Sequence, residues 1–306
     1  EQTVDLLARL VRLGCVNDLT ADSGGEERAA DLLEEFFAGL PVSIERITPH
    51  PGRTTLVVTL VGSEPSSDGT PLTLVGHTDV VPVDEAKWTR DPFGAQIEDG
   101  VMWGRGTVDM LHLTAAMAVV TRQVARRAQA GEPPARSLVF VAAADEEARG
   151  GLGVPWIGDN RPDAFPWDAA LSEMGGAHIR GRRGGDSVVV VVGEKGAAQR
   201  RLHIRGDAGH GSVPLGRTSA VERLAQVSAA LSAARWPTAT DEVWAGFVRA
   251  FEFEEATETS LINGTYEGDY AEFGDLAAFA HAVSHVTVAQ TVAHSGGPIN
   301  VMPSHA

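Results

Sequence analysis

Residues 72–82, with the sequence Leu-Thr-Leu-Val-Gly-His-Thr-Asp-Val-Val-Pro, join a short apolar run to a polar turn. The apolar run has the composition of a buried strand, and His77 follows directly after it. Because open α/β sheets place their sites at the carboxyl ends of strands, His77 is a candidate zinc ligand. Asp79 would then accept a hydrogen bond from the second ring nitrogen. The alternative is a loop histidine followed by a helix-capping aspartate.

Strands and helices alternate on both sides of this segment. Helical periodicity between residues 4 and 39 falls into two pieces, and Ser23 can cap the second. Strands are predicted at 54–61, 72–75, 137–143 and 169–171, with a turn at 63–70 and a buried helix at 113–124. The alternation predicts an α/β domain with a mostly parallel sheet flanked by helices.

The pattern changes near residue 184. A β-branched run at 187–192 leads to a Gly-Glu-Lys-Gly break, an alternating segment at 201–205, and helical segments at 220–234 and 276–283. We therefore expect a catalytic domain at residues 1–195 and a smaller inserted α+β domain at residues 196–306.

Composition narrows the classes of function. The 306 residues are 43% hydrophobic and 22% charged, as is typical of a globular protein. The formal net charge of -16 argues against nucleic acid or an anionic membrane as a partner. No apolar stretch reaches the length of a membrane span. The single cysteine, Cys15, excludes an internal disulfide and fits a reducing cytoplasm.

A second candidate ligand lies in residues 103–110, Trp-Gly-Arg-Gly-Thr-Val-Asp-Met. The glycines permit sharp turns, and Asp109 stands just before the predicted helix at 113–124. A carboxylate there can bridge two metal ions, or it can simply cap the helix.

Carboxylates also follow the two later strands. In residues 144–151, Glu146 and Glu147 come directly after the strand at 137–143, and Glu173 follows the strand at 169–171. Adjacent carboxylates repel unless a cation or protons neutralise them, although a solvated acidic turn is the alternative. One imidazole with several carboxylates is typical of a hydrolytic zinc site, whereas a structural site uses cysteines. The chain has no Gly-x-Ser-x-Gly motif and no phosphate-binding loop.

Six motifs together resemble those of the M20 metallopeptidases, a family of aminoacylases, carboxypeptidases, dipeptidases and deacylases. In chain order they are Gly-His-Thr-Asp-Val-Val-Pro (76–82), Trp88 with Asp-Pro-Phe (91–93), Trp-Gly-Arg-Gly-x-x-Asp-Met (103–110), Asp-Glu-Glu (145–147), Ser-Glu-x-Gly-Gly (172–176) and Gly-His-Gly-Ser-Val-Pro (209–214). Their order is the order found in that family.

The resemblance implies a two-zinc site. His77 and Glu173 would bind one zinc ion, Glu147 the other, and Asp109 would bridge the two. Glu146 would act as the general base and then as the general acid. Co2+ and Mn2+ are the alternatives to zinc.

The resemblance also implies a role for the smaller domain as a lid and dimerisation domain. His210 would reach the active site of the partner subunit in a homodimer and stabilise the oxyanion. Asn300 would contact the substrate.

Two departures from the family pattern are present. Leu111 and His112 stand where the family usually has Lys and Gly. Family members also return to the catalytic domain after the small domain, and that segment carries a second histidine ligand, whereas this sequence ends at Ala306. We therefore expect the ligands of the second zinc to be incomplete within these residues, and neither His294 nor His305 is assigned to fill the place.

The function expected is zinc-dependent hydrolysis of an amide bond in a small peptide or an N-acyl amino acid. One alternative is a biosynthetic deacylase that acts on an N-succinyl or N-acetyl amino acid. The other is a catalytically inactive homologue that serves in binding or dimerisation.

Overall fold

The structure is a computed structural model that describes residues 1–64, 70–148 and 151–306. It divides into two compact units, Glu1–Glu173 and Met174–Ala306. The predicted turn at 63–70 and the acidic segment at 144–151 each lie partly outside the described residues. Within the described parts of the chain, no helix combines the length and the apolar character that a membrane crossing requires.

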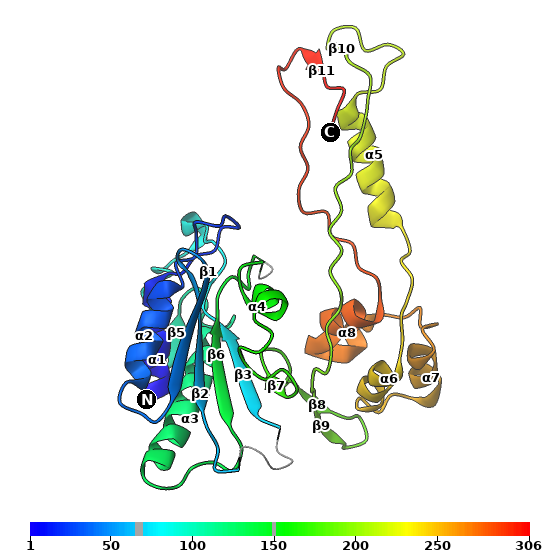
Figure 1. The fold of residues 1–306 in the computed structure, drawn as a ribbon. Helices are drawn as coiled ribbons and strands as arrows, with labels where there is room; N and C mark the ends of the chain where they lie inside the picture. The colour runs from blue at the N-terminus through cyan, green and yellow to red at the C-terminus, as the bar shows by residue number, and fades with distance from the viewer. Residues whose placement is uncertain (65–69, 149–150) are drawn as a thin grey trace. The chain divides into compact units, whose positions relative to one another are not determined.

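The first unit is built on a five-stranded sheet (Figure 1). In spatial order, its strands are β1 (Ser43–His50), β2 (Arg53–Leu60), β6 (Leu138–Ala143), β3 (Leu72–His77) and β7 (Ala170–Leu171). Strand β2 is antiparallel to both of its neighbours, whereas β3 is parallel to both of its neighbours. The sheet is therefore mixed, which corrects the expectation of a mostly parallel sheet.

The connections between strands explain this mixture. A tight turn at Pro51 and Gly52 joins β1 to β2, and a turn this short can join only antiparallel strands. The connection from β3 to β6 passes through the long helix α3 (Leu111–Gln129), which gives the crossover that parallel pairing requires. Strand β1 was not predicted because it lacks an apolar run and buries only Ile47 fully.

Helices cover both faces of the sheet. Helices α1 (Gln2–Leu13), α2 (Glu27–Phe37) and α3 pack on the face that includes Val58, and α4 (Val154–Asn160) packs on the face that includes Val57 (Figure 1). Successive residues of a strand point to opposite faces, so a strand covered on both sides has no exposed position. This explains why all 6 residues of β6 are buried.

The start of α2 differs from the prediction. Glu26 occupies its N-cap position, and no side chain caps the helix. Ser23 lies too far before the first turn to cap it, and its hydroxyl instead accepts a hydrogen bond from the backbone N–H of Asp18 and donates one to the carbonyl of Thr20.

Short elements fill the connection between β3 and α3. They are the 3-10 turn η1 (Glu85–Lys87) and a hairpin of β4 (Gln96–Glu98) and β5 (Val101–Trp103).

The second unit has its own aromatic core. Its elements near this core are the hairpin of β8 (His178–Arg180) and β9 (Asp186–Val188), helices α6 (Glu242–Arg249), α7 (Glu255–Ile262) and α8 (Ala277–Ser284), and the 3-10 segment η2 (Tyr270–Leu276). Ile179 of the hairpin packs with Trp244 and Phe273. Because the hairpin belongs to this core, the observed division falls after Glu173, earlier in the chain than the expected boundary at 195.

The remaining elements of the second unit are α5 (Ala220–Ala233) and a two-stranded ladder of β10 (Gly209–His210) and β11 (Val301–Met302). A capping box of Ser219 and Glu222 begins α5 close to its predicted start. The predicted strand at 187–192 is shorter than expected. The segment at 201–205 forms no regular strand, because its pairing is an isolated bridge between Arg205 and His305.

Candidate metal centre

Three neighbouring strands bring the predicted ligands to one edge of the sheet. Strands β3 and β6 run in parallel with His77 opposite Ala143, so the acidic segment begins beside the histidine. Strand β7 is parallel to β3 on its other side and ends two residues before Glu173. Parallel strands end at the same edge, and this is where open α/β sheets form sites.

His77, Asp109 and Glu173 converge at this edge. One ligating atom from each lies within 4.8 Å of the others. The Nε2 atom of His77 is 3.2 Å from Oδ1 of Asp109 and 3.9 Å from Oε2 of Glu173. The imidazole is 2% exposed, whereas the side chain of Asp109 is 67% exposed, so the cluster opens to solvent on the Asp109 side. A buried nitrogen ligand with accessible carboxylates can hold a cation that still reaches solvent.

A close approach of α3 to β3 places Asp109 beside His77. The hydroxyl of Thr114 on α3 donates to the backbone carbonyl of His77 at 2.8 Å. A Cβ atom at Gly76 would lie 2.5 Å from that hydroxyl oxygen, so glycine is required for this contact. The N-cap residue of α3 is Met110, so Asp109 lies before the helix and its carboxylate is not the cap. The peptide bond between these two residues is cis.

Asp79 contacts His77 differently from the prediction. The Nδ1 atom of His77 donates to the backbone carbonyl of Asp79 at 2.9 Å, while the nearest carboxylate oxygen is 3.5 Å away. Because a carbonyl only accepts, Nδ1 carries a proton, and Nε2 is the ring nitrogen that faces Asp109 and Glu173. The carboxylate instead accepts hydrogen bonds from the backbone N–H groups of Glu146 and Glu147, at 3.1 and 3.0 Å.

The carboxylates and the imidazole perturb one another strongly. Burial lowers the pKa of His77, but the nearby carboxylate of Asp79 and the negative charges of Glu146 and Glu173 outweigh burial and raise it to about 10. Burial, together with the charge of Asp109, raises the pKa of Glu173 to about 7. Burial and the charge of Asp109 also raise the pKa of Glu147. Protons thus occupy positions where a divalent cation would relieve the same repulsion, so this donor set fits a metal ion.

Glu146 and Glu147 lie beside this cluster with different exposures. An Oε2 atom of Glu146 is 3.8 Å from Nε2 of His77, and this side chain is 53% exposed. Glu147 is partly buried, and it is not one of the three residues whose ligating atoms lie within 4.8 Å of one another. The exposed carboxylate of Glu146 can meet both solvent and a substrate.

A buried polar cluster that the sequence analysis did not predict lies behind the acidic segment. Its members are Asn17, Glu26, Arg53, Asp79 and Asp145, and none is more than 4% exposed. Asp79 and Asp145 follow apolar strands, which is a detectable signal. Asn17 and Arg53 lie in no motif, and their 3.2 Å hydrogen bond spans residues distant in the chain.

The other two predicted site residues belong to the second unit. Strand β10 ends at His210, and Gly211 donates through its backbone N–H to the carbonyl of Asn300 at 2.8 Å. The structure therefore brings His210 and Asn300 together. The backbone N–H of Ser212 donates to Nδ1 of His210, which leaves the neutral ring with its proton on the exposed Nε2.

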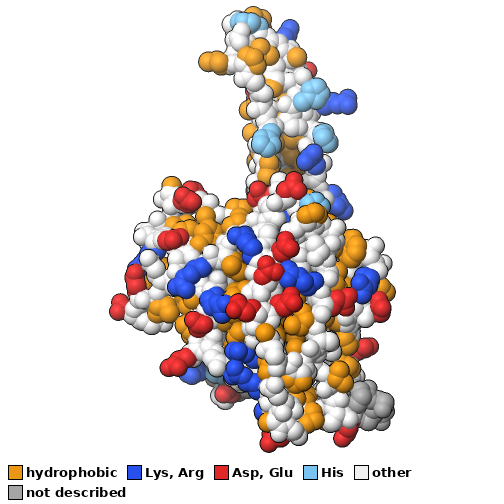
Figure 2. All heavy atoms as spheres, turned by 60° about the vertical axis from the view of Figure 1, so that its left-hand side comes forward, with side chains coloured by type: hydrophobic (Ala, Val, Ile, Leu, Met, Phe, Trp, Pro, Cys, Tyr) orange, Lys and Arg blue, Asp and Glu red, His pale blue; other side chains and the backbone are white. Residues whose placement is uncertain are grey.

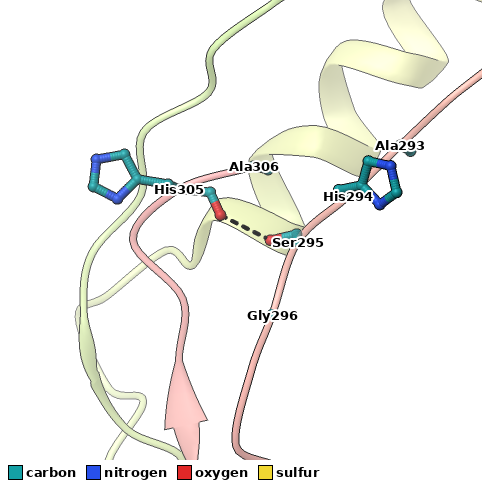
Figure 3. A pocket seen from close by; sticks show the side chains of 6 residues that line it. All are labelled: Ala293, His294, Ser295, Gly296, His305 and Ala306. Atoms are coloured by element: carbon teal, nitrogen blue, oxygen red, sulfur yellow. Dashed lines mark hydrogen bonds between the residues drawn. The ribbon is translucent and has the colours of Figure 1, made fainter. Parts of the chain in front are cut away.

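A cavity of about 500 Å³ lies in the second unit and contains none of the predicted site residues (Figure 3). It is lined by Ala293, His294, Ser295, Gly296, His305 and Ala306. The Ser295 hydroxyl donates to the carbonyl of His305 at 3.0 Å. No acidic side chain lines this cavity, so it lacks the carboxylates of the candidate metal centre.

Residues 73–296 match the model of peptidase family M20/M25/M40. Among solved structures, the M20 metallo-carboxypeptidase Sso-CP2 of Sulfolobus solfataricus aligns with a TM-score of 0.58 at 15% identity, over 100% of this chain and 69% of that one. Human carnosine dipeptidase 1 aligns at 0.55 and 14%, over 99% and 67%. The dipeptidase Dug1p of Saccharomyces cerevisiae aligns at 0.53 and 16%, also over 99% and 67%. At identities of 14% to 16%, the likeness shows that this chain shares the fold of these three proteins.

Proposed function

This chain belongs to peptidase family M20/M25/M40, a family of metal-dependent peptidases, and we propose that it is a zinc hydrolase that cleaves an amide bond in a small peptide or an N-acyl amino acid. The observation that carries the proposal is the convergence of His77, Asp109 and Glu173, with their ligating atoms within 4.8 Å of one another. The carboxylate of Glu146 lies beside them, 3.8 Å from the imidazole.

The proposed metal is zinc, because hydrolytic zinc sites combine histidine nitrogen with carboxylate oxygen. His77 and Glu173 would hold one ion, Glu147 would hold a second, and Asp109 would bridge them. The hydrogen bond from Nδ1 of His77 to the carbonyl of Asp79 turns the other ring nitrogen toward Asp109 and Glu173, where it could bind an ion. When bound, zinc supplies polarisation of the scissile carbonyl and lowers the pKa of a bound water.

We propose that Glu146 is the group that moves protons in this reaction. It would accept a proton from the attacking water and later deliver it to the leaving amine, a role that requires hydrogen-bond reach of both. Its partial exposure leaves the carboxylate accessible to water and substrate. The backbone of Glu146 is fixed by Asp79, which reduces the motion of the reacting group.

We propose that His210 and Asn300 complete the site across a homodimer. The exposed Nε2–H of His210 can donate to a developing oxyanion, an interaction that is worth roughly a hundredfold to a thousandfold in turnover in other enzymes. Asn300 lies beside the loop that carries His210 and would contact the substrate.

The relatives favour a peptide substrate. Two of the aligned proteins are dipeptidases and one is a carboxypeptidase. On the face shown in Figure 2, basic side chains are interspersed with acidic ones, and this supports a small-molecule substrate rather than a polyanion. The single cysteine supports a cytoplasmic location. A deacylase of N-succinyl or N-acetyl amino acids is the second candidate.

The test is hydrolysis of a panel of dipeptides, N-acetyl and N-succinyl amino acids by chelator-treated protein, before and after addition of Zn2+, Co2+ or Mn2+. We expect activity to return with a metal ion and to be greatest on one substrate class. Glu132→Gln is the matched control, because this carboxylate is exposed and lies beyond the far end of α3. Full activity in the metal-free protein, or no activity on any substrate with any metal, would contradict the proposal.

A further inference from the structure

Behind the segment that carries Glu146 and Glu147, Asn17 lies at the centre of the buried polar cluster. The Asn17 side chain is 1% exposed, and the cluster contains three carboxylates and one guanidinium, those of Glu26, Asp79, Asp145 and Arg53. Burying polar groups is costly unless they are hydrogen bonded, so each member must be held in a defined position.

The Asn17 amide uses its full hydrogen-bonding capacity. Its two N–H groups donate to the carboxylates of Asp79 at 2.8 Å and Asp145 at 3.0 Å. Its oxygen accepts from the Arg53 guanidinium at 3.2 Å and from the backbone N–H of Leu19 at 3.1 Å. Carboxylates can only accept, so the orientation of the amide is fixed.

The two carboxylates held by Asn17 belong to loops that follow different strands. Asp79 follows β3 and accepts the backbone N–H groups of Glu146 and Glu147. Asp145 follows β6, accepts from the backbone N–H of Leu152 at 2.8 Å, and has a positive φ of 61°. Two buried carboxylates repel unless donors or cations compensate their charges, and the two N–H groups of Asn17 supply one donor to each.

The cluster also anchors Asn17 from behind. The Arg53 guanidinium donates to Glu26 at 2.7 Å, and Glu26 accepts the backbone N–H of Asp145 at 3.1 Å. A Cβ atom at Gly24 would lie 2.1 Å from Nη1 of Arg53, so the chain leaves room for this guanidinium. The backbone N–H of Asn17 itself donates to the carbonyl of Val80 at 2.8 Å. Asn17 is therefore tied to both loops through its backbone and its side chain.

We propose that Asn17 is a positioning residue for the hydrolytic reaction, which holds Asp79 and Asp145 together and thereby fixes the backbone of Glu146 and Glu147. The inference rests on the proposed function, because it assigns Asn17 a part in that reaction. Asn17 touches neither the three clustered ligands nor the substrate in this role. It acts through Asp79.

The test compares Asn17→Ala with Leu33→Ala, a buried core substitution that destabilises the same unit without contacting the polar cluster. Amide hydrogen exchange of Glu146 and Glu147 reports directly on their hydrogen bonds to Asp79. In Asn17→Ala we expect faster exchange at these two amides and a kcat lower by roughly tenfold to a hundredfold, as for other supporting residues, with KM close to that of the unaltered protein. In Leu33→Ala, measured well below its unfolding temperature, we expect unchanged kcat.

The outcomes separate the alternatives. In Asn17→Ala, unchanged amide exchange at Glu146 and Glu147 would overturn the inference, and so would faster exchange with a normal kcat. It would also be overturned if Leu33→Ala, at an equal loss of stability, lost as much kcat as Asn17→Ala. If Asn17→Ala does not fold, Asn17→Ser, whose single hydroxyl cannot donate to both carboxylates, is judged by the same criteria. An unaltered protein that hydrolyses no substrate contradicts the proposed function, whereas an active one with an unaffected Asn17→Ala contradicts this inference.

Discussion

Glu146 and Glu147 are neighbours in the chain, and the backbone N–H group of each donates a hydrogen bond to the carboxylate of Asp79. We nevertheless propose different tasks for their side chains. Glu146 is half exposed beside His77, whereas Glu147 is partly buried and its pKa is raised by burial and by the charge of Asp109. The more exposed carboxylate suits proton transfer, and the more buried one suits a metal ligand.

Replacing each glutamate separately tests this division. Glu146→Gln is expected to keep its zinc and to lose turnover by roughly 10²- to 10⁴-fold, because an amide cannot carry the proton. Glu147→Gln is expected to weaken zinc binding. Zinc affinity by competition with a chromophoric chelator, together with kcat, measures both effects. Equal loss of zinc in the two variants would show that the roles are wrongly assigned.

The perturbed groups at the centre predict how zinc binding depends on pH. His77 has its pKa raised from 6.5 to about 10 in the metal-free protein, so its stabilising protonation is complete below 6.5 and is lost as the pH rises through 10. The pKa of Glu173 is raised from 4.5 to about 7, so its contribution has the same sign and is lost as the pH rises through 7. A metal ion displaces these protons, and it therefore binds better at higher pH.

Thermal unfolding with and without zinc, between about pH 5 and about pH 8, measures this effect. We expect the increase in Tm on adding zinc to grow with pH, and zinc at a hundredfold excess over its Kd to stabilise the fold by about 2.7 kcal/mol. An increase in Tm that is independent of pH, or that declines as pH rises, would contradict the picture of protons and zinc competing for the same ligands.

At the scale of elements, the approach of α3 to β3 determines whether Asp109 reaches His77. Gly76→Ala would place a Cβ atom 2.5 Å from Oγ1 and 3.1 Å from Cα of Thr114, so the hydroxyl must turn away and the helix must shift slightly from the strand. We expect a loss of about 1–3 kcal/mol in the free energy of unfolding and weaker zinc binding. Gly158→Ala in α4 is the control, because its nearest neighbour would be Trp167 at 4.0 Å and alanine favours a helix. Unchanged zinc affinity in Gly76→Ala would show that zinc binding does not depend on the close approach of α3 to β3.

The elements that the sequence predicted best are those with long apolar runs. Strands β2, β3 and β6 are mostly buried, helix α3 buries one face, and all four were expected close to their observed positions. The edge strand β1 and the short helices α4, α6 and α7 were not predicted, because β1 has one fully buried residue and the helices span only 7 or 8 residues. The direction of strands depends on connections and neighbours, so the mixed sheet was not foreseen.

The candidate site, like the fold, was predicted in part from the sequence. His77, Asp109 and Glu173 were recognised from strand ends and the motifs around them, and the structure brings them together. The supporting residues Asn17 and Arg53 were not recognised, because their importance lies in hydrogen bonds between segments distant in the chain. A buried charge leaves no periodic signal in a sequence.

At the scale of the whole molecule, the residues predicted for the site are divided between the two compact units. His77 and its neighbours lie in Glu1–Glu173, whereas His210 and Asn300 lie in Met174–Ala306. We propose that the second unit of one protomer serves the first unit of its partner, so that each half of a homodimer is incomplete alone.

Mixing two inactive variants tests this arrangement. His210→Ala and Glu146→Gln proteins are each expected to be nearly inactive, but hybrid dimers would contain one intact site and recover part of the activity. The recovery should appear at the rate of subunit exchange, which native mass spectrometry follows with one variant isotopically labelled. Proven exchange without any recovered activity would exclude action of His210 across the dimer.

The central claim is that His77, Asp109 and Glu173 hold the catalytic zinc ion, and the zinc dissociation constant tests it most directly. Competition with a chromophoric chelator would be measured for the unaltered chain, for His77→Ala, Asp109→Asn and Glu173→Gln, and for the exposed control Glu132→Gln. We predict that each of the three substitutions raises the dissociation constant by at least about tenfold, since even supporting residues of metal sites have effects of that size, and that the control leaves it unchanged. Equal zinc affinity in all of these proteins would contradict the account.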